Sequence, residues 1–64
     1  MIRRYLVHFL LSMKGYSIPF TRTMVGDGGE AAKVAWRAVV MAEAVERKGS
    51  AGISITIEAI EPLN

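Results

Sequence analysis

The sequence predicts an α+β domain of type ββαβ, a single domain over residues 1–64 with a hairpin, one helix and a last strand. Three observations support this prediction. Residues 3–11 (RRYLVHFLL) are largely apolar at both odd and even positions, which is typical of an interior strand covered on both faces. A glycine-rich segment at residues 26–29 precedes a long stretch with helical spacing of apolar residues. Residues 53–59 alternate between apolar and polar, as a half-buried strand does.

The first two strands are predicted to form a hairpin, because Lys-Gly at positions 14–15 suits a two-residue turn. This turn would place Phe9 opposite Phe20, both on the side of the sheet that meets the helix. A three-residue turn would instead send one set of apolar side chains to the opposite face. Pro19 has no N–H to donate to a ladder, so the second strand, residues 16–25, is predicted to be an edge strand.

A helix is predicted over residues 28–48, with Asp27 as its N-cap, Glu30 completing a capping box and Gly49 after its end. Helical spacing places seven apolar residues on one face, which we expect to pack on the sheet: Ala31, Val34, Ala35, Ala38, Met41, Ala42 and Val45. Four of the seven are alanine, so the helix is expected to lie close to the strands.

Residues 53–61 are predicted to form the third strand, with four odd-numbered residues facing the helix: Ile53, Ile55, Ile57 and Ala59. Ile60 breaks the alternation, which indicates a bulge. The helix leads back to the sheet by a right-handed crossover. Because the second strand is an edge, the third is expected beside the first, in the order 2-1-3. The first strand is then central and antiparallel to both neighbours.

Small size and composition predict a homodimer. A domain of 64 residues usually needs disulfides, a metal or a second subunit to be stable. With no cysteine and one histidine, no disulfide, metal site or cofactor is predicted, and 52% apolar residues are many for a small monomer. The sheet face away from the helix, with Leu6, His8 and Leu10 at its centre, is therefore expected to pack on a second copy. His8 would either bond a threonine or tune assembly with pH.

The N-terminus places two arginines before an apolar run, as a signal peptide does. His8 interrupts this run, no small-residue cleavage site follows, and a turn begins at residue 14. The run is also far shorter than the ~20 residues that cross a bilayer. A cytoplasmic protein without a membrane segment is the prediction.

One histidine and dispersed carboxylates assemble no catalytic motif, so an enzyme is not predicted. Trp36 and Val40 lie one turn apart, away from the alanine-rich face, with Lys33 and Arg37 beside them. Large apolar side chains among charges are typical of binding hot spots. We expect a non-enzymatic protein-binding module with these four residues as its contact patch. The other interpretation of Trp36 is that it covers a sheet edge.

The alternative function is nucleic-acid binding by four basic residues of the open sheet face: Arg3, Arg4, Arg22 and Lys14. The formal charge is only +2 and the basic residues are dispersed. The aromatic residues that could stack on bases fall on the helix side of the predicted sheet. Nucleic acid is therefore the less favoured partner.

The layout resembles small phage and prophage proteins of unassigned function, in which a hairpin, one helix and an Ile/Val-rich strand follow one another. The matching segments are YLVHFLLSMKGYSIPF and ISITIEAIE, which cover most of the chain. The resemblance implies a small protein that binds a host or phage macromolecule, as anti-CRISPR and similar inhibitors do. It carries over no functional residue.

Overall fold

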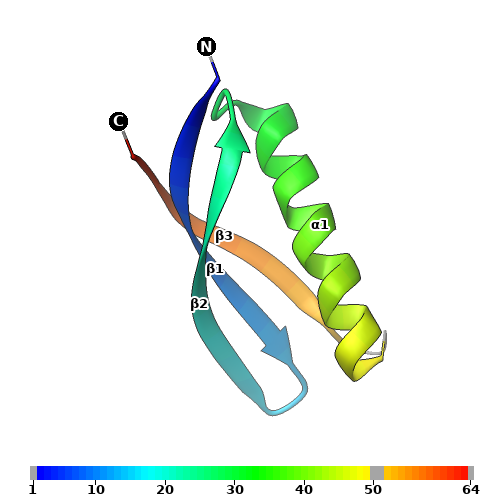
Figure 1. Cartoon of the computed structure of the whole chain (residues 1–64). Helices are drawn as coiled ribbons and strands as arrows, with labels where there is room; N and C mark the ends of the chain where they lie inside the picture. Colours follow the sequence, from blue (N-terminus) through cyan, green and yellow to red (C-terminus); the bar gives the residue numbers. More distant parts are fainter. Residues whose placement is uncertain (1, 50–51, 64) are drawn as a thin grey trace.

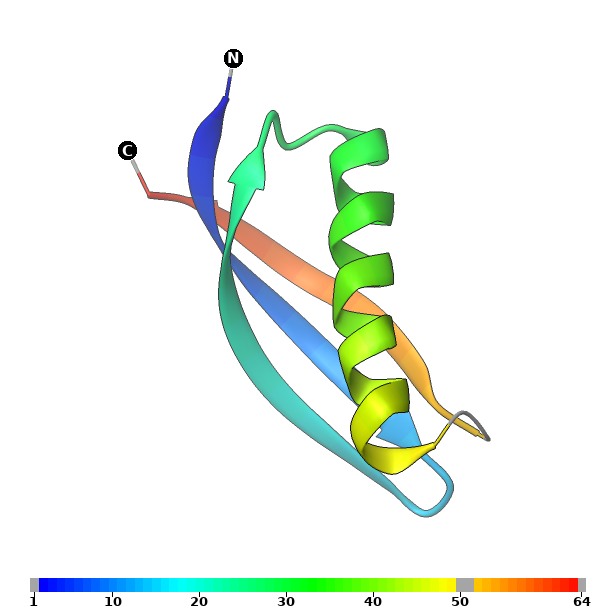
Figure 2. The same cartoon turned by 45° about the vertical axis from the view of Figure 1, so that its right-hand side comes forward.

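The computed structural model describes residues 2–49 and 52–63 and has the expected ββαβ order (Figure 1). Its elements are β1 (Arg3–Met13), β2 (Tyr16–Gly26), α1 (Glu30–Lys48) and β3 (Ser54–Pro62). The strands form one antiparallel sheet in the order β2-β1-β3. The helix lies on one face of this sheet in both views (Figures 1 and 2). The predicted fold class and strand order are confirmed.

The hairpin has the predicted turn and register. Met13 pairs with Tyr16 across a two-residue turn, and Phe9 faces Phe20. Their rings stack with centroids 5.3 Å apart. Gly15 has a φ of 93°, the left-handed conformation that such a turn favours. Side chains at even positions of β2 therefore share the helix side of the sheet with those at odd positions of β1.

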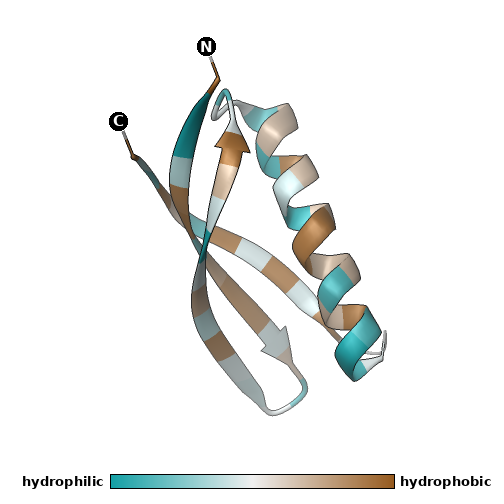
Figure 3. Ribbon diagram, viewed as in Figure 1, coloured by the Kyte–Doolittle hydropathy of each residue, from teal (hydrophilic) through white to brown (hydrophobic). Residues whose placement is uncertain are grey.

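A bulge interrupts the pairing of β3 with β1. Phe9 pairs with Ile57 whereas His8 pairs with Ala59, so Glu58 is the extra residue. The bulge reverses the parity of β3 and turns Ala59 to the open face, which corrects the prediction that it faces the helix. It also accounts for the phase break expected at Ile60. Figure 3 shows the alternating brown and pale bands of this strand.

The helix presents a different face to the sheet from the predicted one. Trp36, Val40 and Ala44 are its buried residues, with exposed fractions of 5%, 3% and 7%. Of the seven residues expected to be buried, five are exposed and two half-buried: Ala31, Val34, Ala35, Ala38 and Ala42, then Met41 and Val45. A tryptophan buries roughly 150–250 Å², several times what an alanine methyl offers. Burying the Trp36 row therefore removes more apolar surface from water.

The helix also starts later than predicted. Gly29 is the N-cap residue and no side chain caps the helix. Asp27 instead accepts a hydrogen bond at Oδ1 from the Gly29 N–H, at 2.8 Å, which forms an Asx turn before the helix. The predicted Asp27 capping box is therefore wrong. The other end is as predicted, because the Gly49 N–H donates to the carbonyl oxygen of Val45 at 2.9 Å.

The core lies between the odd positions of β1 and the buried row of α1. Val7 and Phe9 are its most deeply buried side chains. The nine core residues are Tyr5, Val7, Phe9, Leu11, Met24, Trp36, Val40, Ala44 and Ile55. All of them are on the helix side, so the opposite face of the sheet contributes nothing to this core.

Candidate functional site

The two apolar residues of the predicted contact patch, Trp36 and Val40, belong to the core rather than to the surface. The Trp36 indole N–H donates to the carbonyl oxygen of Val25 at 3.0 Å, at the edge of β2. Its ring centroid lies 5.6 Å from that of Tyr5. Val40 is buried one turn later. The prediction that Trp36 and Val40 anchor a partner is wrong, because α1 is rotated to bury both side chains against the sheet.

The two charged members of that patch remain at the flank of α1. Lys33 is half-buried, with Nζ 3.5 Å from Oε1 of Glu30, and Arg37 is exposed. Together with Glu30 and Glu58 they line a hollow of about 280 Å³ between α1 and β3. Two positive and two negative charges balance there, so the hollow has no net charge with which to select a partner.

The open face of the sheet is the first of two candidate surfaces. Leu6, His8 and Leu10 follow one another along the centre of β1 and are half-buried. No element among residues 2–49 and 52–63 packs over them, because α1 lies on the opposite face (Figure 2). His8 Nε2 lies 2.6 Å from Oε1 of Glu61, so its partner is a carboxylate and not the threonine that the sequence suggested.

Polar residues surround the apolar centre of this face. Leu6 pairs with Thr23 of β2, and Leu10 pairs with Thr56 of β3. Both threonines are exposed. An apolar centre with a polar rim is the usual composition of a protein interface.

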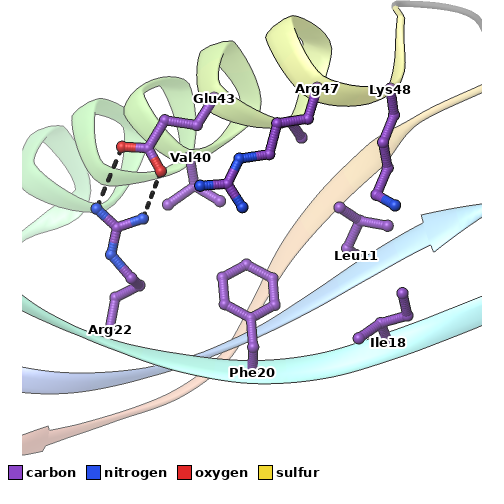
Figure 4. Close-up of a pocket in the computed structure, with 9 residues that line it drawn as sticks. Leu11, Ile18, Phe20, Arg22, Val40, Glu43, Arg47 and Lys48 are labelled. Atoms are coloured by element: carbon purple, nitrogen blue, oxygen red, sulfur yellow. Dashed lines mark hydrogen bonds and ion pairs between the residues drawn. The ribbon is translucent and has the colours of Figure 1, made fainter.

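The second candidate surface is a groove of about 430 Å³ between the C-terminal half of α1 and β2 (Figure 4). Its apolar lining consists of Leu11, Ile18, Phe20, Val40 and Ala44. Its charged lining consists of Arg22, Glu43, Arg47 and Lys48. Figure 4 shows Ile18 and Phe20 pointing from β2 toward the helix, with Arg47 and Lys48 extending toward them from α1.

An ion pair closes one end of the groove. Arg22 donates to both carboxylate oxygens of Glu43, at 2.5 Å from Nη1 and 3.2 Å from Nη2. These hydrogen bonds lower the pKa of the Glu43 carboxyl, and the positive charges of Arg22 and Arg47 lower it further. The same hydrogen bonds raise the pKa of the Arg22 guanidinium. Within the part of the chain that the structure describes, Arg47 and Lys48 form no ion pair, so the groove has a net positive charge.

The groove results from a decrease in side-chain size along α1. Trp36, Val40 and Ala44 form one buried row at intervals of four residues. Trp36 reaches the edge of β2, whereas the methyl group of Ala44 leaves Ile18 39% exposed and Phe20 half-buried. The groove was not predicted from the sequence, because Trp36 and Val40 were expected on the outer face of the helix. The sequence signal for the groove was the decrease in side-chain size from Trp36 through Val40 to Ala44 at four-residue intervals, followed by Arg47 and Lys48.

The structure does not bring the four basic residues of the nucleic-acid alternative together. Arg3 and Arg4 begin β1 and Lys14 lies in the turn at its other end, about 33 Å away along an extended strand. Arg22 is on the helix side, paired with Glu43. Its predicted place on the open face is wrong. Residues 20 and 22 are two apart in the same strand, so the Arg22 side chain lies on the helix side together with that of Phe20.

The described residues were also searched for a metal site, for unpaired buried polar atoms and for a membrane-spanning helix. Within residues 2–49 and 52–63, no three His, Asp or Glu side chains gather in a position to hold a metal ion. No buried side-chain nitrogen or oxygen of these residues lacks a hydrogen-bond partner. The helix that they form is not apolar over a length that could span a bilayer.

Comparisons with known proteins add no relative. No family model matches the chain, and searches of curated proteins and of solved structures return no match. The resemblance in layout to small phage proteins therefore stays an expectation.

Proposed function

We propose that this chain is a small, non-enzymatic protein-binding module that works as a homodimer joined through its open sheet face. The observation that carries the proposal is the pair Leu6 and Leu10, which lie at the centre of β1 with no part of the described chain over them. Strands of this length at 4.8 Å spacing give a face of roughly 500 Å². Two such faces bury about 1,000 Å² in total, the lower limit for a specific interface.

The outward face of α1 is the competing dimer surface. It is apolar, and Val34 is 52% exposed there. Most of its other residues are alanines, whose methyl groups each bury little surface. The sheet face offers two leucines and a threonine rim over three strands, so it is the stronger candidate. Face-to-face packing would leave α1 and the groove on the outside of both copies, available to a partner.

Sedimentation velocity of the purified chain tests this proposal. We expect a particle of twice the 7.0 kDa chain mass. Leu10→Glu should give a monomer with unchanged circular dichroism, because two carboxylates would be buried at the dimer interface. Val34→Glu is the matched control on the outward face of α1 and should remain dimeric.

Two results would overturn the proposal. A wild-type chain that sediments as a monomer at all concentrations would remove the homodimer. Dissociation by Val34→Glu together with a persistent dimer of Leu10→Glu would assign the interface to the helix instead.

A further inference from the structure

The groove between α1 and β2 exposes apolar surface on the core side of the sheet. Leu11 and Phe20 form its floor, and Ile18 is 39% exposed beside them. Since the groove opens beside α1, it stays accessible when the opposite face of the sheet is covered.

Its electrostatics select an anion. Arg22 and Glu43 neutralise one another at one end, which leaves the charges of Arg47 and Lys48. The helix C-terminus contributes only about half a negative charge, less than these two cations supply. Figure 4 shows Arg47 above Phe20, with Lys48 near Leu11. An acidic group bound there would lie next to the apolar floor.

The shape of the groove suits a peptide rather than a small molecule. Small-ligand pockets enclose about 70–90% of their ligand, whereas Arg47, Lys48 and Ile18 are all exposed here. A chain segment can enter and leave such an open groove. It is not expected to extend the sheet, because Pro19 lies on the free edge of β2 and provides no N–H for an added strand. Side chains must then provide recognition.

We propose that this groove binds an acidic–apolar peptide segment of a partner protein. An aromatic or aliphatic side chain of the segment packs on Phe20 and Ile18. Flanking carboxylates pair with Arg47 and Lys48. This proposal names the partner chemistry of the proposed binding module, and it does not depend on the dimer.

Nuclear magnetic resonance titration of the full ¹⁵N-labelled chain tests it with two blocked peptides, acetyl-EFELE-amide and its neutral counterpart acetyl-QFQLQ-amide. We expect the acidic peptide to shift the amide signals of Phe20, Ala44 and Arg47. The neutral peptide should bind about tenfold more weakly, the effect of two surface ion pairs. Equal affinities of the two peptides would overturn the proposal, as would shifts confined to Leu6 and Leu10 on the open face.

Charge variants locate the site on α1. Replacing Arg47 and Lys48 with glutamine should weaken binding of the acidic peptide about tenfold. The matched control replaces Lys33 and Arg37 with glutamine, which removes the same charge from the same helix. It should leave the affinity for the acidic peptide within about twofold of the wild type. An equal loss in both double variants would show non-specific attraction and overturn the assignment.

Filling the groove provides a test that does not rely on charge. Ala44→Leu should abolish the peptide-induced shifts while the thermal midpoint remains near that of the wild type. Decanoate is the lipid control, and saturation by decanoate without binding of the acidic peptide would assign the groove to acyl anions instead. Repeating the titration on Leu10→Glu separates the two proposals, because the groove should bind equally well in a monomer.

Discussion

The two ends of the interface between α1 and the sheet differ in how completely they are filled. At one end Trp36 contacts Tyr5 and donates a hydrogen bond to Val25. At the other end Ala44 occupies the same row, and the apolar surface of Ile18 stays exposed. The backbone at both ends is regular helix over regular strand, so the difference is one of side-chain volume.

The difference teaches where stability and recognition are expected to lie. The filled end requires a close approach of the backbone, since a Cβ on Gly28 would lie 2.6 Å from the Tyr5 hydroxyl and one on Gly26 would lie 2.9 Å from the Trp36 ring. The open end has no such constraint and presents two cations beside an apolar floor. Substitutions at the first end should therefore lower stability, and those at the second should alter binding.

The largest expected effect is that of Trp36→Ala. Removing a buried tryptophan typically costs about 3–5 kcal/mol, comparable to the whole stability of a domain this small. Thermal unfolding followed by circular dichroism should show a largely unfolded chain at 37 °C. Trp36→Phe, which keeps a ring but loses the hydrogen bond to Val25, should cost about 1–2 kcal/mol. Ile18→Ala at the open end is the comparison and should cost less than about 1 kcal/mol; similar losses at both ends would contradict the distinction.

A smaller loss is expected from Gly28→Ala. Its φ is +80°, and the added methyl group would meet the Tyr5 ring, so the substitution should cost about 1–3 kcal/mol. Gly15→Ala is the comparison, because Gly15 also has a positive φ, of +93°, and an added Cβ there would meet no atom within 4 Å. Urea unfolding should show a larger loss for Gly28→Ala. Equal losses of stability would mean that the Tyr5 side chain moves away from the added methyl group at no cost in free energy.

The smallest effect is expected from Glu43→Gln at the end of the groove. Because the folded-state pKa of Glu43 lies below its unfolded value, its stabilising contribution is present above the ordinary carboxyl range and is lost as pH falls through the folded pKa. The thermal midpoint of the wild type should therefore fall more between pH 6 and pH 3, roughly the range that spans carboxyl titration, than that of Glu43→Gln.

Glu46→Gln is the matched control for this substitution. Glu46 is exposed on α1 and forms no ion pair within the described part of the chain. Its variant should keep the pH dependence of the wild type. If Glu43→Gln also kept the pH dependence of the wild-type thermal midpoint, the ion pair between Glu43 and Arg22 would contribute nothing measurable to stability.

Local chemistry was sufficient to predict the sheet. The Lys-Gly turn and the parity of the first two strands predicted that Phe9 faces Phe20, and Pro19 marked β2 as an edge. The phase break at Ile60 predicted a bulge, although the sequence could not place the extra residue at Glu58. The N-cap was mispredicted because Asp27 can cap a helix or close a turn before it, and both use the same side-chain oxygen.

The sequence by itself determined the order of the elements, the hairpin register and the strand order, because turn length, side-chain parity and the missing N–H of proline act over a few residues. Only the tertiary structure decided which face of α1 is buried. The helix is apolar on two sides, and periodicity counts apolar residues without weighing their size. Trp36 is buried because it has the most surface to remove from water and finds an acceptor in Val25. The same rotation places Ala44 over Phe20 and so creates the groove.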